Sequence, residues 1–218
     1  MNRPYRIDTH QHIIPPGYER WMHQKGIRPG GLSLPSWSER SALKFMNRHD
    51  VQTGILSLST PGVYFGDAVE ARLRAREVNE YSAEVVAARP ERFGFFATLT
   101  LPDVEGALAE AEYALDTLLA DGIVLLANSA GRYLGDPGFE PLLEFLHHRR
   151  AVVFIHPGAL PAPAVPGIPT FVADFLLDTT PAPPSAWSCP ARWRNTRESS
   201  SSWPTRAASC HTSPRGSC

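Results

Sequence analysis

The sequence predicts an α/β fold built on a parallel β-sheet, on three observations. Its apolar runs, such as residues 122–127 and 151–156, are continuous rather than alternating, which is typical of strands buried on both faces. These runs alternate with segments of helical periodicity. The alternation starts at the first strand and recurs five times by residue 157.

The first two strands enclose a long loop and a helix. The first strand is expected at residues 5–7, and a Pro- and Gly-punctuated loop follows over residues 13–37. A connection of this length is often an active-site loop. Ser38 is a candidate N-cap for a helix over residues 41–49. The second strand is then expected at residues 54–59.

A long helix is expected over residues 67–88, because its apolar side chains recur at helical spacing and Pro90 follows its end. The stripe consists of Val69, Leu73, Val78, Tyr81 and Val85. Residues 92–101, rich in Phe and Leu, predict the third strand. Asp103 is expected to cap a third helix over residues 104–120.

The fourth strand, residues 122–127, precedes a polar, Gly-rich loop over residues 128–137. A helix over residues 139–149 and a strand over residues 151–156 follow. Five β-α units with polar residues after the strands favour a barrel over a doubly wound sheet, and no Gly-x-Gly-x-x-Gly follows the first strand. A complete barrel needs typically about 250 residues. The prediction is therefore an incomplete TIM-type (β/α)8 barrel with about five of eight units.

Three histidines stand at the ends of predicted strands. His10 and His12 are separated by one residue at the end of the first strand, so their side chains project to the same side. His156 ends the fifth strand and precedes Pro157. Neutral imidazoles are ligands for divalent transition metals, so the three predict a metal site. The His-x-His spacing alone would fit a pair of surface histidines equally well.

Charge and hydropathy argue against two kinds of partner. The net charge of −1 does not suit a nucleic-acid surface. No run approaches the about 18 apolar residues that a membrane helix needs, and no charged-then-apolar leader opens the chain. We therefore expect a cytoplasmic protein without nucleic-acid or membrane partners.

Several motifs occur together in the order of a known family. They are the His10-x-His12 and His156-Pro157 pairs and residues 34–38, 56–63, 92–99, 131–137 and 178–180. Over residues 1–180 the sequence resembles the amidohydrolase superfamily. Within it, the sequence resembles the metal-dependent decarboxylases related to aminocarboxymuconate-semialdehyde decarboxylase, and most of all the 6-methylsalicylate-type decarboxylases.

The resemblance implies a metal site and a function. His10, His12 and His156 match three metal ligands, for zinc or alternatively manganese. The family also has an Asp ligand after the eighth strand and a functional His in a His-x-Gly-Gly motif; neither matches a residue here, so the catalytic residues are unassigned. The implied function is a decarboxylase of an aromatic or unsaturated carboxylic acid, such as a salicylate, and full-length relatives are expected to be homo-oligomers. The alternatives are a hydrolase of the same superfamily, such as a lactonase, and a fragment without activity.

Four residues are candidates for substrate contact. Asn128, Arg132 and Tyr133 lie on the loop after the fourth strand, on the catalytic face of a barrel. Trp37, with Phe65, is a candidate for an aromatic pocket. Loop capping by Asn128 and packing by Tyr133 are the alternatives.

Residues 181–218 differ in composition from residues 1–180. They contain no Leu, Ile, Val, Met, Phe, Tyr or Lys, and they hold nine Ser, six Pro, five Arg and all three cysteines. A disordered tail is one interpretation. In a frame shifted by one base, however, Trp203-Pro204 must encode Ala, and the next codons permit His-Ala-Gly-Gly, the family's motif. We therefore predict the N-terminal part of the barrel over residues 1–180 and an out-of-frame coil tail over residues 181–218.

Overall fold

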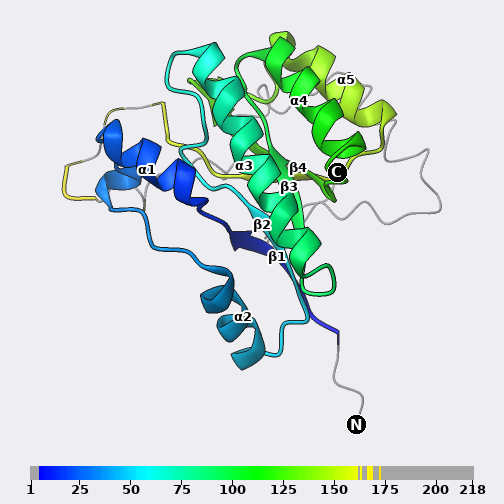
Figure 1. Ribbon diagram of the computed structural model, residues 1–218. Helices are drawn as coiled ribbons and strands as arrows, with labels where there is room; N and C mark the ends of the chain where they lie inside the picture. Colours follow the sequence, from blue (N-terminus) through cyan, green and yellow to red (C-terminus); the bar gives the residue numbers. More distant parts are fainter. Residues whose placement is uncertain (1–4, 162, 164–165, 169–171, 173–218) are drawn as a thin grey trace, which may run out of the picture.

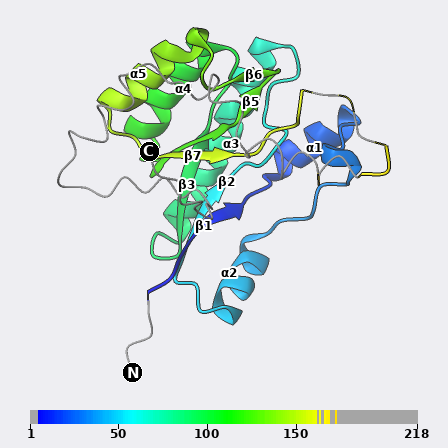
Figure 2. The ribbon, with the colours of Figure 1, turned by 180° about the vertical axis from the view of Figure 1, so that it is seen from behind.

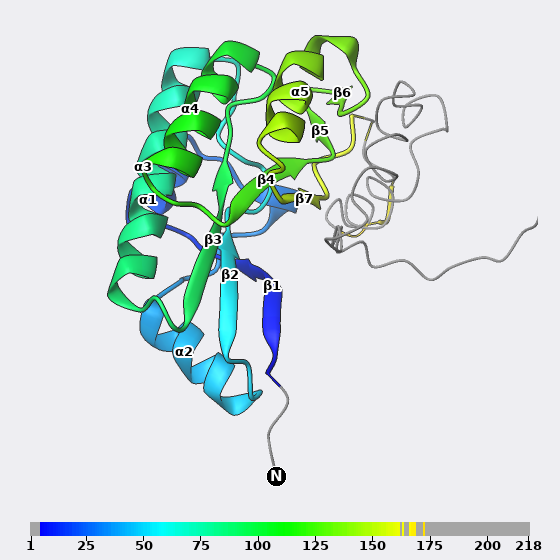
Figure 3. The same ribbon diagram turned by 90° about the vertical axis from the view of Figure 1, so that its right-hand side faces the viewer.

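The computed structural model describes residues 5–161, 163, 166–168 and 172. Five strands form one curled parallel sheet in the order β1-β2-β3-β4-β7 (Figure 3). They are β1 Ile7–His12, β2 Thr53–Ser57, β3 Phe93–Thr98, β4 Gly122–Leu126 and β7 Val153–His156. This sheet and its helices are part of a (β/α)8 barrel, which confirms the predicted fold class.

Helices cover the outer face of the sheet. Figures 1 and 2 show α3 beside α4 and α4 beside α5 on that face. The α-helices are α1 Pro16–Gln24, α2 Glu39–Arg48, α3 Ala68–Ala88, α4 Val104–Asp116 and α5 Glu140–His148, and the 3-10 turns are Pro29–Gly31 and Pro137–Phe139. The main core lies between sheet and helices, with Leu56, Phe95, Ile123 and Leu125 from the strands meeting Met46, Ala111 and Leu142 from the helices.

The inner face of the sheet has its own small apolar cluster. Phe96, Val124 and Phe154 are buried there, and Ile55 packs against them. The Phe96 and Phe154 rings stack with centroids 5.7 Å apart. Side chains two residues further along the same strands share this face, because strand side chains alternate. The inner face therefore has an apolar floor below its carboxyl-terminal rim.

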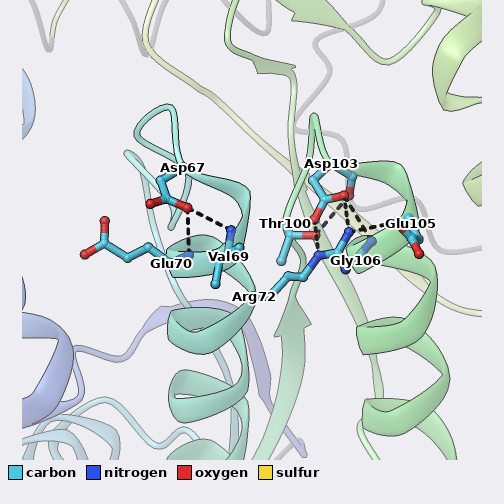
Figure 4. A network of polar contacts seen from close by, with 8 residues as sticks. All are labelled: Asp67, Val69, Glu70, Arg72, Thr100, Asp103, Glu105 and Gly106. Carbon is cyan, nitrogen blue, oxygen red and sulfur yellow. Dashed lines mark hydrogen bonds and ion pairs between the residues drawn. The ribbon is translucent and has the colours of Figure 1, made fainter.

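Aspartates begin the two longest helices (Figure 4). The Asp67 carboxylate accepts a hydrogen bond from the backbone N–H of Val69 at the start of α3. Asp103 accepts from the N–H of Gly106 at the start of α4, as expected for a cap. Arg72 of α3 donates to Asp103 over 2.6 Å, so this cap also ties α3 to α4.

The first helix is a correction to the predicted loop over residues 13–37, since α1 occupies its beginning. Pro16 stands at the start of the helix, where its fixed φ suits helical backbone and its missing N–H costs nothing. Three apolar side chains then fall on one face and pack towards α3: Tyr18, Trp21 and Met22. The Pro and Gly residues of this segment therefore punctuate a helix and a turn rather than a structureless loop.

Several boundaries also differ from the prediction. β1 extends beyond residues 5–7 to His12, so both histidines lie within the strand. The loop over residues 128–137 contains a short antiparallel hairpin, β5 Asn128–Ser129 and β6 Arg132–Tyr133. No helix of the described residues is long and apolar enough to cross a lipid bilayer. The predicted coil tail, residues 181–218, lies outside the described residues.

Candidate metal centre

The three predicted histidines meet at the carboxyl-terminal rim of the inner face. His10, His12 and His156 each offer one nitrogen, and these nitrogens all lie within 4.8 Å of one another. The Nε2 atoms of His12 and His156 are 3.2 Å apart. The His10 ring lies 4.9 Å from that of His12 and 5.0 Å from that of His156, measured between centroids.

The backbone of β1 and β7 presents these rings. His10 and His12 alternate with Gln11 and so share the inner face. The pairing of β1 with β2 shifts register between Asp8 and Gln11, beside His10. The Asp8 carboxylate accepts a hydrogen bond of 3.1 Å from the His10 N–H, which anchors the irregular backbone. Edge-to-face contact with Phe154, 5.1 Å between centroids, supports the His10 ring from below.

Backbone carbonyls define which nitrogen of each imidazole is available. The His156 Nδ1 lies 2.8 Å from the carbonyl of Pro157, and the His12 Nδ1 lies 3.3 Å from the carbonyl of Ser57. Because a carbonyl only accepts hydrogen bonds, Nδ1 must carry the hydrogen in both rings. Both Nε2 atoms therefore present a lone pair to the centre, as in metal-binding histidines.

Burial keeps the imidazoles neutral. Burial first, and then a neighbouring histidine, lower the pKa of His12 to about 4 and that of His156 to about 4. Burial also lowers the pKa of His10, although the Asp8 carboxylate works in the opposite direction. Neutral imidazole is the form that binds a metal, so the cluster is in its ligand form at pH 7.

The donor set fits a divalent transition metal. Two nitrogens bound at about 2.0–2.1 Å to one tetrahedral ion lie about 3.3 Å apart, close to the 3.2 Å between the His12 and His156 Nε2 atoms. Three protein ligands leave a coordination position open, which is the composition of catalytic rather than structural zinc sites. His156 is buried and His10 is exposed, so the open side faces the rim.

Two of the predicted substrate-contact residues, Asn128 and Arg132, lie after β4, where their polar groups bind other parts of the chain. The Asn128 amide donates to the carbonyl of Ala159 over 2.9 Å and accepts from the N–H of Gly131. Arg132 forms a bidentate ion pair with Asp136, at 2.8 and 3.0 Å. This pair lowers the pKa of Asp136 to about 2.

The remaining contact candidates differ in position. Tyr133 is half-buried in β6. Trp37 packs against both the main core and the apolar cluster around α1, with its ring 6.3 Å from that of Tyr81. It does not line the cavity described below. Phe65 does line that cavity, and its ring packs on Trp21.

A cavity of about 260 Å³ opens at the carboxyl-terminal ends of β2, β3 and β4. Leu126 belongs to its wall and pairs with His156 of the next strand, so cavity and histidines are neighbours. The loop after β2 forms another wall, and the Tyr18 hydroxyl holds it by donating to the Gly62 carbonyl over 2.7 Å.

Two buried hydroxyls were missed in the sequence. The Oγ of Ser57 and the Oγ1 of Thr98 have no hydrogen-bond partner among the described residues. Ser57 stands beside His12 in the sheet, and Thr98 lines the cavity. The available signal was a hydroxyl residue at the end of an apolar strand, on the same face as the inner apolar cluster.

A curled parallel sheet with its candidate site at the carboxyl ends of the strands is the arrangement of (β/α)8-barrel enzymes. The chain belongs to the amidohydrolase family, whose profile, described as Amidohydrolase, matches residues 7–195. The resemblance seen in the sequence motifs is thereby confirmed.

Two relatives of the chain are named as decarboxylases. The chain is 43% identical over 188 residues to decarboxylase yanB of Aspergillus niger, covering 80% of this chain and 51% of the relative. It is 37% identical over 156 residues to a 6-methylsalicylic acid decarboxylase of Penicillium expansum, covering 70% and 48%. The chain thus spans about half the length of the curated relatives it matches.

A solved structure with the same fold contains a metal. It is the 5-carboxyvanillate decarboxylase of Novosphingobium aromaticivorans, complexed with manganese and 4-hydroxy-3-methoxy-5-nitrobenzoic acid. The two chains share 26% sequence identity with a TM-score of 0.62, over 72% of this chain and 51% of that one.

Proposed function

We propose that the protein is a divalent-metal-dependent decarboxylase, a carbon–carbon lyase acting on an aromatic carboxylic acid of the salicylate type. The observation that carries the proposal is the centre itself: three neutral imidazoles with donor atoms within 4.8 Å, at the mouth of the half-barrel. The names of the relatives support the reaction and the substrate class. The small-molecule acid is the partner that we propose.

His10, His12 and His156 would hold the metal through their ring nitrogens. Zinc suits three imidazoles, and manganese, present in the similar decarboxylase structure, is the alternative. The bound ion would supply a Lewis acid that orients the carboxylate or a neighbouring phenolic oxygen of the substrate.

The other inner-face residues would shape the surroundings of the substrate. Phe96, Val124 and Phe154 form an apolar floor below the histidines. Apolar surroundings strengthen the polar contacts made at the rim. His12 and His156 would each hold the metal through Nε2, and each donates its Nδ1 hydrogen to a backbone carbonyl. The proton that replaces the lost carboxyl group would therefore not come from these two rings.

We further propose the division of the chain at about residue 180 into barrel and out-of-frame tail. The family match extends beyond this point, to residue 195. Sequencing the gene through codons 175–200 would test whether the frame shifts there. Without the family's His-x-Gly-Gly motif and last Asp, the chain as written is expected to be inactive. Restoring the reading frame is expected to return the His-x-Gly-Gly motif and the last Asp, and with them the activity.

The test compares the 218-residue chain with the frame-restored protein, each loaded with zinc or manganese. Carbon dioxide release from 6-methylsalicylate and 2,6-dihydroxybenzoate measures decarboxylation, and opening of an aromatic lactone measures the rival hydrolase activity. We expect carbon dioxide release from the restored protein alone. Lactone opening without carbon dioxide release would show that the protein is a hydrolase rather than a decarboxylase.

A further inference from the structure

The first strand carries one residue more than its neighbour beside the metal centre. Asp8 pairs with Gly54, and three residues later Gln11 pairs with Leu56 of β2. Only two positions separate Gly54 from Leu56, so β1 holds an extra residue in this stretch. Such a β-bulge interrupts the ladder of hydrogen bonds and changes the direction of the side chains within it. Because His10 lies in the bulge, the bulge sets the direction of its ring.

A side chain of the same strand holds the bulge. The half-buried Asp8 carboxylate accepts a hydrogen bond of 3.1 Å from the His10 N–H. Aspartate is suited to bonding the backbone two residues further on, and this bond gives a partner to a group displaced from the regular ladder. Among the described residues the cluster of donor atoms consists of the three histidines, and Asp8 is not part of it. Its carboxylate therefore acts on the backbone.

The residue after His10 turns to the opposite face. The Gln11 amide lies against the buried Gly54, where an added Cβ would overlap with it. A glycine inside a strand often marks such a close approach. Leu56, two residues further along β2, belongs to the main core, so Gly54 shares this outer face. With Gln11 on the outer face, its neighbours His10 and His12 are directed to the inner face.

His10 is the ring that depends most on its backbone. The Nδ1 atoms of His12 and His156 each contact a backbone carbonyl, whereas the His10 ring has no hydrogen bond among the described residues. His10 is also exposed, so surrounding side chains do not enclose it. The position of its ring nitrogens therefore follows from the backbone at the bulge.

We propose that Asp8 is a positioning residue of the metal centre, which acts through the backbone of His10. Its carboxylate holds the bulge and thereby keeps the His10 ring beside those of His12 and His156. The inference rests on the metal binding of the proposed function, and it is independent of the decarboxylation step.

The test is a double-variant cycle of zinc affinity. Zinc is titrated into the metal-depleted 218-residue chain and into Asp8→Ala, His10→Gln and the variant with both changes. We expect Asp8→Ala to weaken zinc binding by about tenfold or more. In the His10→Gln background the same change should have no further effect, because Asp8 acts through His10. Equal weakening in both backgrounds, or no weakening at all, would overturn the inference.

A conservative variant separates the hydrogen bond from the charge. Asp8→Asn retains an acceptor oxygen without the charge, so it should bind zinc nearly as tightly as the unaltered chain. An affinity as low as that of Asp8→Ala would assign the effect to charge and overturn the inference. Asp8→Leu, of similar shape but without an acceptor, replaces Asp8→Ala if that variant does not fold.

The matched control is Asp121→Ala. The Asp121 carboxylate also accepts from a strand backbone N–H, that of Phe95 over 2.9 Å, but it precedes β4 and so lies at the opposite end of the sheet from the histidines. It should leave the zinc Kd unchanged, and a loss equal to that of Asp8→Ala would overturn the inference. Zinc binding that requires His10 but not Asp8 would refute the inference alone. Zinc binding that is absent from the unaltered chain would refute the proposed metal centre as well.

Discussion

His12 and His156 stand on the two edge strands of the five-stranded sheet, yet their Nε2 atoms are 3.2 Å apart. Four strand spacings of about 4.8 Å would separate them by about 19 Å in a flat sheet. The curl of the barrel therefore creates the candidate centre, and neither edge strand could form it alone. A change that reduces the curvature of the sheet should also move the three imidazoles apart.

Stability of the metal-free chain should fall in mild acid. His12 and His156 have pKa values of about 4 when folded and near 6.5 when unfolded. Between pH 6.5 and 4 the unfolded chain binds more protons, so the free energy of unfolding decreases as the pH falls through this range. Urea denaturation with a chelator at pH 7.5, 6 and 5 measures it. The double variant His12→Gln, His156→Gln should show a flatter profile, and an equal slope would contradict the assignment.

Removal of the Ser57 hydroxyl should change the free energy of unfolding only slightly. Its Oγ is buried without a partner among the described residues, so Ser57→Ala removes an unsatisfied group rather than a bond. We expect the free energy of unfolding to change by less than about 0.5 kcal/mol or to rise. Thr100→Val, which breaks an existing bond, should lose about 1 kcal/mol. A loss at Ser57 as large as at Thr100 would show that its hydroxyl has a partner.

The Asn79 side chain should be a major contributor to stability. It binds both backbone groups of Thr98 and the Glu110 carboxylate inside the molecule. Asn79→Ala leaves both backbone groups of Thr98 without this partner, while Arg76 still binds Glu110, and the change should cost about 2–3 kcal/mol. The control Asn47→Ala, at an exposed bond to Arg92, should stay within about 0.5 kcal/mol. Equal denaturation midpoints for the two variants would exclude the network.

Arg132 should act on its own loop rather than on a ligand. Its guanidinium is paired with Asp136 and lies over the Phe139 ring. Because this ion pair is exposed to solvent, Arg132→Gln should lower the free energy of unfolding only slightly. In the frame-restored protein, Arg132→Gln should leave the KM for 6-methylsalicylate unchanged. A KM raised tenfold would return Arg132 to the substrate-binding residues.

The positions of β2, β3, β4 and β7 were predictable because each is a short, largely apolar run that alternates with a helical segment. Asp103 and Ser38 were expected to cap helices, and both do so. The helix α1 was missed because Pro16 and the nearby glycines resemble loop punctuation, whereas the buried positions of Tyr18 and Trp21 depend on contact with α3.

The candidate site was predictable in part. The sequence alone showed that His10 and His12 project from the same face of β1 and that His156 ends a strand. In the structure the three rings lie together. The residues that surround the three histidines could not be predicted from the sequence. Ser57 and Thr98 look like ordinary strand residues until the sheet curls, and only the structure shows that the Asn128 amide binds Ala159 and Gly131.

The three-histidine metal centre is tested most directly by a zinc titration of the metal-depleted chain in a calorimeter. We predict one site per chain, weak enough that dialysis leaves far less than one zinc bound, because the three described ligands lie on the two edge strands and only the curl of the sheet holds them together. His12→Gln and His156→Gln should each weaken binding by more than about tenfold, while His23→Gln, on α1, should not. Zinc binding that is absent from the unaltered chain, or equal in all four proteins, would contradict the three-histidine centre.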